Sequence, residues 1–158
     1  MDIILREDIA APIAHVFAQA TDTQAFERQA LRRGADLRRL DRLPQPGPGA
    51  AWRIVFPFRG RERELEAQMT RLENPTLAEW TFRSAGLQGV LRAECLALSR
   101  TTTRLTLALT LEGRSLTARL LVQSLRLARG SLERRAEPRL KAWSREVEAR
   151  WQRRQARV

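Results

Sequence analysis

The stretch that decides the fold is Thr103–Leu111, which reads TRLTLALTL, with leucine at positions 105, 107, 109 and 111. Polar or small residues stand between the leucines, and Glu112-Gly113 follows them. Apolar residues at every second position are typical of a β-strand that buries one face against a core. The run therefore predicts a strand with a leucine-lined inner face and a turn immediately after it.

The same alternation recurs upstream and predicts an antiparallel sheet of about seven strands. The predicted strands span residues 2–11, 35–43, 51–58, 62–72, 77–84, 87–98 and 103–111. Short turns at Arg59-Gly60-Arg61 and Ala85-Gly86 join consecutive strands, which indicates an antiparallel meander. The proline- and glycine-rich run PQPGPG at 44–49 is predicted to be a loop between two of the strands.

Two short helices are predicted between the first and second strands. Pro12 suits the first turn of a helix, and apolar residues follow it at helical spacing at positions 13, 16, 17 and 20. Asp22 is a suitable N-cap for a second helix over Thr23–Arg33, which Gly34 ends.

A long C-terminal helix is predicted from Ser115 to about Gln155. Its apolar stripe repeats every three or four residues, which is the spacing of one helix face. The stripe consists of Leu121, Leu125, Ala128, Leu132, Ala136, Leu140, Trp143, Val147 and Trp151. Gly130 and Pro138 are the weak points, and Pro138 is expected to kink the helix because it removes one backbone hydrogen bond.

The predicted order is one strand, two short helices, six strands and one long helix, which defines an α+β fold. An antiparallel sheet with one apolar face must cover that face, and the striped C-terminal helix is the element available to do so. A chain of 158 residues fits a single domain spanning 1–158. Residues 152–158 are expected to fray as a terminal tail.

This order of elements resembles the helix-grip superfamily, also called SRPBCC or START-like, in which a curved antiparallel sheet wraps around a long C-terminal helix. Two segments carry the resemblance: Ile9–Phe17 (IAAPIAHVF), with Asp22 and Phe26 after it, and Gly47–Trp52 (GPGAAW). The first looks like the superfamily's strand–proline–helix opening, and the second is similar to its Gly-x-Gly-x-x-Trp entry into the third strand. The superfamily includes START lipid-transfer domains, the birch-pollen (Bet v 1) allergen family and bacterial polyketide cyclase/dehydrase-like proteins.

The resemblance implies a cavity between sheet and helix that accepts a lipid, quinone, polyketide, sterol or other apolar molecule. The superfamily has no universal catalytic residues, so the resemblance assigns no active site to this chain. We therefore expect binding or transport of a small apolar ligand without catalysis. A cyclase- or dehydratase-type enzyme using the same pocket is the alternative, and it would need an inward-facing acid or base.

The ligand-binding candidates are side chains that alternation places on the inner face of the sheet, together with two leucines from the helical stripe. They are Trp52, Ile54, Phe56, Trp80, Phe82, Cys95, Leu107, Leu109, Leu121 and Leu125. Ligand pockets are mostly apolar, which suits this set, although ordinary core packing accounts for the same residues. The small side chains at positions 93, 95 and 97 either leave volume for a ligand or make room for the helix backbone.

Groups for catalysis or metal binding are few. The chain has one histidine, one cysteine and no tyrosine, which excludes an internal disulfide and the common zinc sites, so no metal or cofactor is predicted. His15 is expected to lie partly outside the pocket, and Cys95 to be a buried, inert thiol without a base beside it. Arg92 and Glu94, on the opposite face of that strand, are expected to form solvated pairs, with a buried polar anchor as the alternative.

The net charge is +11, and residues 115–158 hold twelve basic and four acidic residues, which is +8 of that total. This basic helix has three interpretations: a solvated outer face, attraction to an anionic membrane surface with Trp143 and Trp151 as anchors, or nonspecific contact with nucleic acid. No recognised nucleic-acid motif occurs, so no specific nucleic-acid partner is predicted, and the oligomeric state stays open. The first residues lack the basic start and apolar run of a signal peptide, so a cytoplasmic location is the default expectation.

Overall fold

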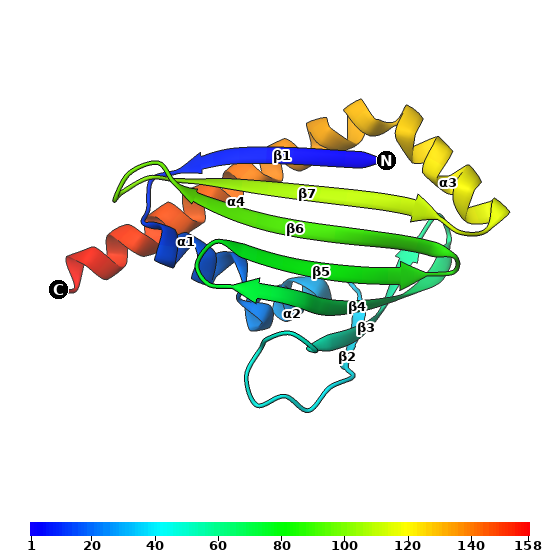
Figure 1. The fold of residues 1–158 in the computed structure, drawn as a ribbon, viewed down its shortest axis with the longest axis horizontal. Helices are drawn as coiled ribbons and strands as arrows, with labels where there is room; N and C mark the ends of the chain where they lie inside the picture. The colour runs from blue at the N-terminus through cyan, green and yellow to red at the C-terminus, as the bar shows by residue number, and fades with distance from the viewer.

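The computed structural model describes all 158 residues as a curved sheet with helices along one side (Figure 1). The elements are β1 (Asp2–Ile9), α1 (Ile13–Ala20), α2 (Thr23–Arg32), β2 (Asp36–Arg39), β3 (Ala51–Phe58), β4 (Arg61–Glu73), β5 (Leu77–Ser84), β6 (Leu87–Ala97), β7 (Thr103–Gly113), α3 (Leu116–Leu127) and α4 (Arg129–Ala156). The seven strands lie in the order β1-β7-β6-β5-β4-β3-β2, and every neighbouring pair is antiparallel. The predicted α+β fold with a seven-stranded antiparallel sheet is confirmed.

Two tight turns set the register of neighbouring strands. Arg59 and Gly60 connect β3 to β4, with φ angles of 52° and 75°. Ala85 and Gly86 connect β5 to β6, with φ angles of 42° and 83°. Positive φ at both central residues is the type I′ geometry, whose twist matches that of the paired strands. Both turns lie where the sequence predicts them.

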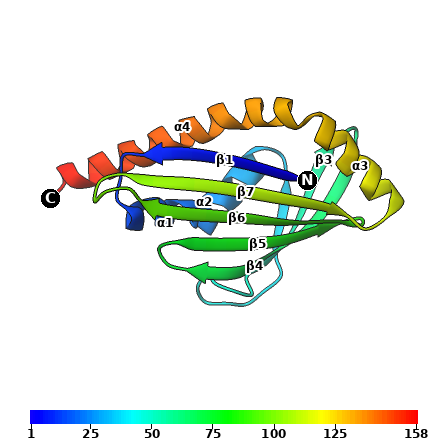
Figure 2. The same cartoon turned by 45° about the horizontal axis from the view of Figure 1, so that its top comes forward.

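The first strand pairs only with the last one. β1 lies at one edge of the sheet and pairs with β7 along its whole length, from Asp2 opposite Thr110 to Ile9 opposite Thr103. At the other edge, β2 pairs with β3 alone. The longest strands are β4, with 13 residues, and β6 and β7, with 11 each, and the sheet bends around the helices (Figure 2).

The two faces of the sheet differ in chemistry. On the concave face the register aligns apolar side chains across the strands, with Trp80 between Met69 and Leu91. Leu109 lies opposite Leu91 on one side and Ile3 on the other. The convex face carries mostly polar and charged side chains that form cross-strand ion pairs. The predicted apolar face is therefore the one that faces the helices.

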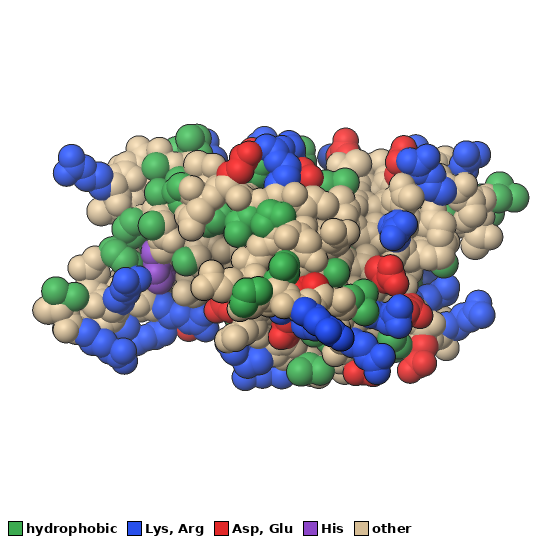
Figure 3. Space-filling view, turned by 60° about the horizontal axis from the view of Figure 1, so that its bottom comes forward, with side chains coloured by type: hydrophobic (Ala, Val, Ile, Leu, Met, Phe, Trp, Pro, Cys, Tyr) green, Lys and Arg blue, Asp and Glu red, His purple; other side chains and the backbone are tan.

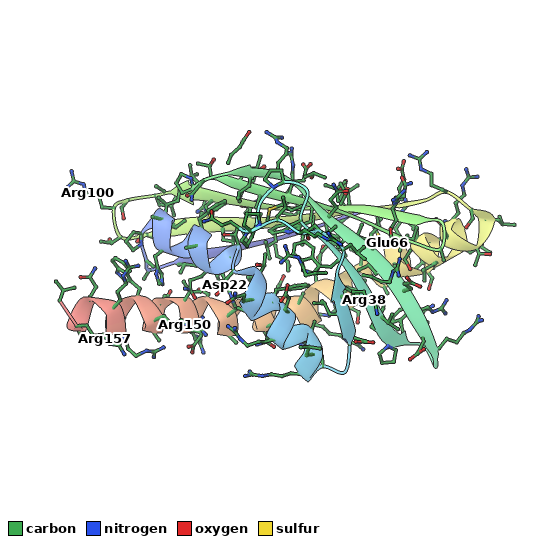
Figure 4. The ribbon with its side chains drawn as sticks, turned by 90° about the horizontal axis from the view of Figure 1, so that it is seen from below. Asp22, Arg38, Glu66, Arg100, Arg150 and Arg157 are labelled. Atoms are coloured by element: carbon green, nitrogen blue, oxygen red, sulfur yellow. The ribbon has the colours of Figure 1, made fainter.

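The helices cover the concave face from one edge. α4 packs against β1 and α1, and α3 packs against β7, so both lie along the β1–β7 side of the sheet. α1 lies between α4 and strands β6 and β7, while α2 packs against β2 (Figure 4). The helix backbones therefore lie closest to β1, β2, β6 and β7, while β3 and β5 meet the helices through side chains such as Trp52 and Ala78.

The C-terminal helix is broken close to Gly130, one of the two predicted weak points, and not at Pro138, where the kink was expected. α3 ends at Leu127 and α4 begins at Arg129. At Ala128 the backbone has φ −93° and ψ 7°, and its N–H donates to the carbonyls of Ser124 and Leu125, which tightens the last turn of α3. Because of this break, α3 follows the end of β7 while α4 follows β1 (Figure 2).

Pro138, where a kink was expected, lies inside α4 without interrupting it. Both Pro138 and Arg134, whose carbonyl loses its helical partner, are exposed. Water can therefore satisfy that carbonyl, and the helix continues at modest cost. α4 extends to Ala156; the side chains of residues 152–158 are exposed, and their fraying stays a prediction.

The second strand is shorter than predicted, because it ends at Arg39 and not at residue 43. The Asp41 carboxylate accepts hydrogen bonds from the backbone N–H groups of Leu43, at 3.0 Å, and Ala51, at 2.8 Å. Arg39 donates two more to it, at 2.8 and 2.6 Å. The Arg39 guanidinium and the Ala51 N–H hold the pKa of the Asp41 carboxyl well below its ordinary value. Side-chain bonds thus replace strand pairing here.

The core consists of two clusters. The larger one joins β1, β5, β6 and β7 to α1 and α4. Its members are Ile9, Ala11, Val16, Phe17, Ala78, Ala93, Cys95, Leu105, Leu140 and Val147. The smaller one contains Ala50, Trp52, Ile54 and Met69, next to β2. Neither cluster includes a residue of α3, so the part of the concave face near α3 lies outside the sealed core.

Candidate functional site

The concave face is only partly sealed by the helices. The accessible surface of the chain is 10580 Å², whereas a compact monomer of 18.1 kDa exposes about 8,100 Å². The free end of α4 and the loop before β3 contribute to this excess, because their side chains are mostly exposed. The space-filling view also shows apolar side chains reaching the surface across the middle of one face, with basic groups around its margins (Figure 3).

Three of the predicted ligand-binding residues are core residues. Trp52 and Ile54 are buried in the smaller cluster, and Cys95 is buried in the larger one. The Trp52 indole N–H donates to Glu27 at 3.0 Å, and the Arg39 guanidinium lies 5.4 Å from the centre of the Trp52 ring. These contacts connect α2, β2 and β3, so Trp52 has a structural role.

The other predicted residues lie nearer the accessible part of the concave face. Phe56, Trp80 and Leu107 are half-buried and pack against the clusters. Phe82, Leu109, Leu121 and Leu125 are half-buried and belong to neither cluster. Phe82, Leu91 and Leu109 make up what we call the open half of the concave face, while Leu121 and Leu125 belong to α3, which packs against β7. Contact with a ligand stays a prediction for all of them.

Phe82 lies flat against the sheet because Gly89 leaves room for it. A Cβ added at Gly89 would lie only 2.1 Å from Cζ of Phe82 and 2.4 Å from its Cε2. The ring therefore occupies the place that a side chain on the neighbouring strand would take. The ring thus lies close to the sheet and does not project into the space above it.

A hollow of about 620 Å³ opens beside β4, and we call it the β4–β5 cleft. Pairing of β4 with β5 ends at Glu66 and Arg83, while β4 continues to Arg61 beyond that point (Figure 4). The cleft lies between this extension and the β5–β6 turn. Its walls are Arg61, Glu62, Arg63, Glu64, Glu66, Arg83, Ser84, Ala85, Gly86, Leu87, Gln88 and Arg114. It is thus lined by charged side chains of both signs, four arginines and three glutamates, unlike the apolar cavity that the sequence predicted.

Most charges around the β4–β5 cleft are paired. Arg53 Nε lies 2.7 Å from Glu64 Oε1, and Arg53 Nη2 lies 3.3 Å from Glu66 Oε1. Arg83 lies 3.9 Å from Glu66, and Arg114 lies 3.5 Å from Glu112. These pairs are exposed and contribute little to stability.

Arg53 Nε is buried without a well-aligned hydrogen bond, but it lies 2.7 Å from Glu64. Arg63 Nε is likewise buried without a hydrogen-bond partner, and the Arg63 side chain has no ion pair. It lies opposite Phe56 in the register, and Leu65 two residues on lies opposite Ile54, so Arg63 stands on the concave face. The sequence analysis did not single it out. The signal was available, since alternation from Leu65 and Ala67 back along the strand places an arginine at an inward position.

A second hollow, of about 310 Å³, lies on the convex face. Its floor crosses four adjacent strands through Gln68, Thr81, Val90 and Thr110. These side chains point away from the helices, and the charged side chains of Glu66, Arg83 and Glu112 also line the hollow. This hollow is therefore unrelated to the predicted ligand site.

His15 is a structural residue, and the expectation that it lies partly outside was wrong. It is buried, its Nε2 lies 3.0 Å from the carbonyl oxygen of Val147, and its ring lies 5.2 Å from that of Trp151. Because a carbonyl only accepts, Nε2 carries the proton in this bond. The side chain ties α1 to α4, which is a structural role.

Cys95 should react slowly with thiol reagents in the folded protein. Burial raises the pKa of its thiol to about 11, so at about pH 8 only roughly one thiol in a thousand is the reactive thiolate. We expect dithiobis-nitrobenzoate to modify native protein at least roughly a hundredfold more slowly than protein unfolded in guanidinium chloride. The native rate should rise as the pH approaches the raised pKa. Equal rates in the two states would show an accessible thiolate and contradict this assignment.

The carboxylates with shifted pKa values lie away from the concave face. Arg104 lowers the pKa of Asp8, and Arg39 lowers that of Asp41. Burial acts to raise the pKa of Glu79, but hydrogen bonds from Arg92 and Thr70 outweigh it and leave the pKa lowered. All three groups favour the ionised form, so none is suited to act as a general acid at neutral pH.

The predicted pair of Arg92 and Glu94 is found on the convex face. Arg92 donates to Glu79 at 3.0 Å and lies 3.7 Å from the exposed Glu94. This is a solvated cross-strand group and not an anchor inside the site. No group of three or more His, Cys, Asp or Glu side chains is placed to hold a metal ion.

The two tryptophans of the basic C-terminal helix, Trp143 and Trp151, are half-buried and pack against the larger core cluster. Contact of this helix with a membrane surface stays a prediction. Several of its arginines are paired along the helix, as Arg129 is with Glu133, and Arg150 with Glu146. None of the helices combines the length and apolar composition needed to cross a membrane.

No protein-family model matches the chain, and no curated protein matches its sequence. Solved structures nevertheless match its fold. TTHA0849 from Thermus thermophilus is 18% identical, with a TM-score of 0.66 over 94% of this chain and 98% of that one. The Zhui aromatase/cyclase from Streptomyces sp. R1128 is 14% identical, with a TM-score of 0.67 over 95% of this chain and 94% of that one.

A point mutant of norcoclaurine synthase from Thalictrum flavum, in complex with a transition-state analogue, is 14% identical, with a TM-score of 0.65 over 93% of each chain. At such identities the likeness concerns architecture alone. These matches agree with the element order, the antiparallel topology and the C-terminal helix described above. The chain therefore has the helix-grip fold, an architecture that it shares with these structures.

Proposed function

We propose that this chain binds a small apolar ligand, such as a lipid, quinone, polyketide or aromatic molecule, between the concave face of the sheet and α3. The observation that carries the proposal is the open half of the concave face, where inward-facing apolar side chains stay partly accessible. A ligand that removed about 200 Å² of this apolar surface from water would gain about 5 kcal/mol before the costs of association.

Phe56, Trp80 and Leu107 would border the ligand, and the residues of the open half would contact it directly. Trp52, Ile54 and Cys95 would support the site from the sealed core. The matched norcoclaurine synthase structure holds a transition-state analogue, which supports a fold able to accept an organic molecule. We propose binding without catalysis, because the concave face offers no carboxylic acid with a raised pKa and His15 is engaged with Val147.

Filling the open half should block the ligand. Leu109→Trp would place a bulky ring beside Leu91, and Leu96→Trp, on the exposed convex face of β6, is the matched control. We expect the neutral fluorophore phenyl-naphthylamine to bind the wild type and L96W equally, and L109W at least about tenfold more weakly. Fluorescence titration measures the three affinities, and thermal unfolding checks that each variant is folded.

Two results would count against the proposal. Wild-type protein that neither enhances the fluorescence of the probe nor carries a copurifying small molecule in native mass spectrometry would remove it. Equal loss of affinity in L96W and L109W would place the probe outside the concave face.

A further inference from the structure

Arg63 is a half-buried arginine on the concave side of β4 that has no ion-pair partner. Its Nε–H is buried and donates no hydrogen bond. Phe56 lies opposite it on β3, and Leu65 follows it on the concave side of β4. A buried donor without an acceptor is rare in folded proteins, because it lowers stability. No structural role of Arg63 accounts for this one.

The surroundings of Arg63 do not supply the missing acceptor. Glu64 and Glu66 are engaged by Arg53 across the strand pair, and Glu62, the other neighbour of Arg63 along the strand, is exposed. All three lie on the convex side of β4, since alternation places them opposite to Leu65. The guanidinium therefore faces the β4–β5 cleft with its charge available to a molecule that enters from outside.

The position of Arg63 joins the two parts of the site. The open half of the concave face provides apolar contact area, and the β4–β5 cleft provides a wet, charged opening at the end of β4. An amphiphilic ligand matches this arrangement, with its apolar body on the concave face and its acid group at the cleft. A guanidinium can bind a carboxylate through two parallel hydrogen bonds, which also fixes the direction of the ligand.

We propose that Arg63 is the binding residue for the carboxylate of an apolar ligand, which this chain thereby selects over neutral molecules of the same shape. The inference rests on the proposed function and names its ligand class. Arg83 also lines the cleft, but Glu66 already lies 3.9 Å from it, and its side chain is largely exposed. It is the matched control, because it carries the same charge in the same cleft without being buried or unpaired.

The test uses two probes that differ only in charge, dansyl-undecanoic acid and its methyl ester. Fluorescence titration gives the affinity of each for the wild type, R63Q, R63K and R83Q at neutral pH. We expect the wild type to prefer the acid by about tenfold, and R63Q to lose that preference while keeping its affinity for the ester. R63K should retain part of the preference, because lysine keeps the positive charge but lacks the two parallel N–H donors of a guanidinium. R83Q should change it less than about twofold.

The ester separates this inference from the proposed function. If the wild type binds the ester but prefers the acid no more than R63Q does, the role of Arg63 is overturned and apolar binding stands. If the preference falls equally in R63Q and R83Q, general attraction by the arginines of the cleft replaces a specific role for Arg63. If neither probe binds the wild type, the proposed function fails and this inference fails with it. Retained ester binding also shows that R63Q is folded.

Discussion

Replacing Gly113 with alanine should lower the free energy of unfolding by about 3 kcal/mol. A Cβ at this position would lie 2.6 Å from the backbone nitrogen of Arg119 and 2.7 Å from the carbonyl carbon of Ala118. Backbone atoms cannot rotate aside, so α3 would have to move away from the end of β7. Since α3 supplies Leu121 and Leu125, the substitution should also weaken binding of an apolar probe. Urea unfolding followed by tryptophan fluorescence measures the loss of stability.

Gly47→Ala is the matched control for this substitution. A Cβ at Gly47 meets no atom within 4 Å, and its φ lies outside the left-handed region. Its stability should stay within about 0.5 kcal/mol of the wild type or rise slightly. An unchanged midpoint for G113A would mean that α3 is not seated against β7 in solution.

Phe17→Ala should be more destabilising still, at about 3–5 kcal/mol, because it removes a large side chain from the larger core cluster. Phe17 is 1% exposed and lies with Val16 in this cluster, where α1 packs between the sheet and α4. Such a loss is comparable to much of the stability of an ordinary domain. We therefore expect partial unfolding near room temperature, visible as loss of the near-ultraviolet circular dichroism of the tryptophans.

The control is Phe26→Ala, on the neighbouring helix α2. Phe26 is 55% exposed, so its removal should change stability by less than about 0.5 kcal/mol. Similar losses in F17A and F26A would show that α1 and α2 share the core equally, contrary to the structure.

The strands were predictable because their signal is local. Leu105 to Leu111 and Trp80 to Phe82 alternate with polar residues, and glycine at the second position of both tight turns marks where each hairpin closes. Register then follows from the turns, which is why the inner face was predicted residue by residue. β2 was overestimated because Asp41 competes for backbone N–H groups through its side chain, which alternation does not reveal.

The kink was expected at Pro138, whereas the helix breaks near Gly130, because the position of the break depends on tertiary packing. Pro138 has the stronger local effect on a helix, but it lies on a solvated face where its missing bond costs little. The direction of α3 is set by close contact of its backbone with Gly113. The spacing of apolar residues along a helix does not predict how these two segments lie relative to each other.

The sequence predicted which side chains share the concave face, but not which of them stay accessible to a ligand. Alternation placed Trp52, Phe82 and Leu109 on the same side, and the strand register agrees with that placement. Which of them are sealed depends on where the helices end, so Trp52 is core while Phe82 and Leu109 stay accessible. Arg63 was missed because attention to apolar residues passes over a charge at an inward position.

The pairing of β1 with β7 affects when the sheet can be completed during synthesis of the chain. During synthesis, β1 is complete after Ile9, but its only partner is finished at Gly113, more than a hundred residues later. At about 5–20 residues per second, the ribosome leaves that first strand unpaired for roughly 5–20 s. The sheet of this chain is therefore assembled late, and its nascent edge must be kept from other chains until the last strand has emerged.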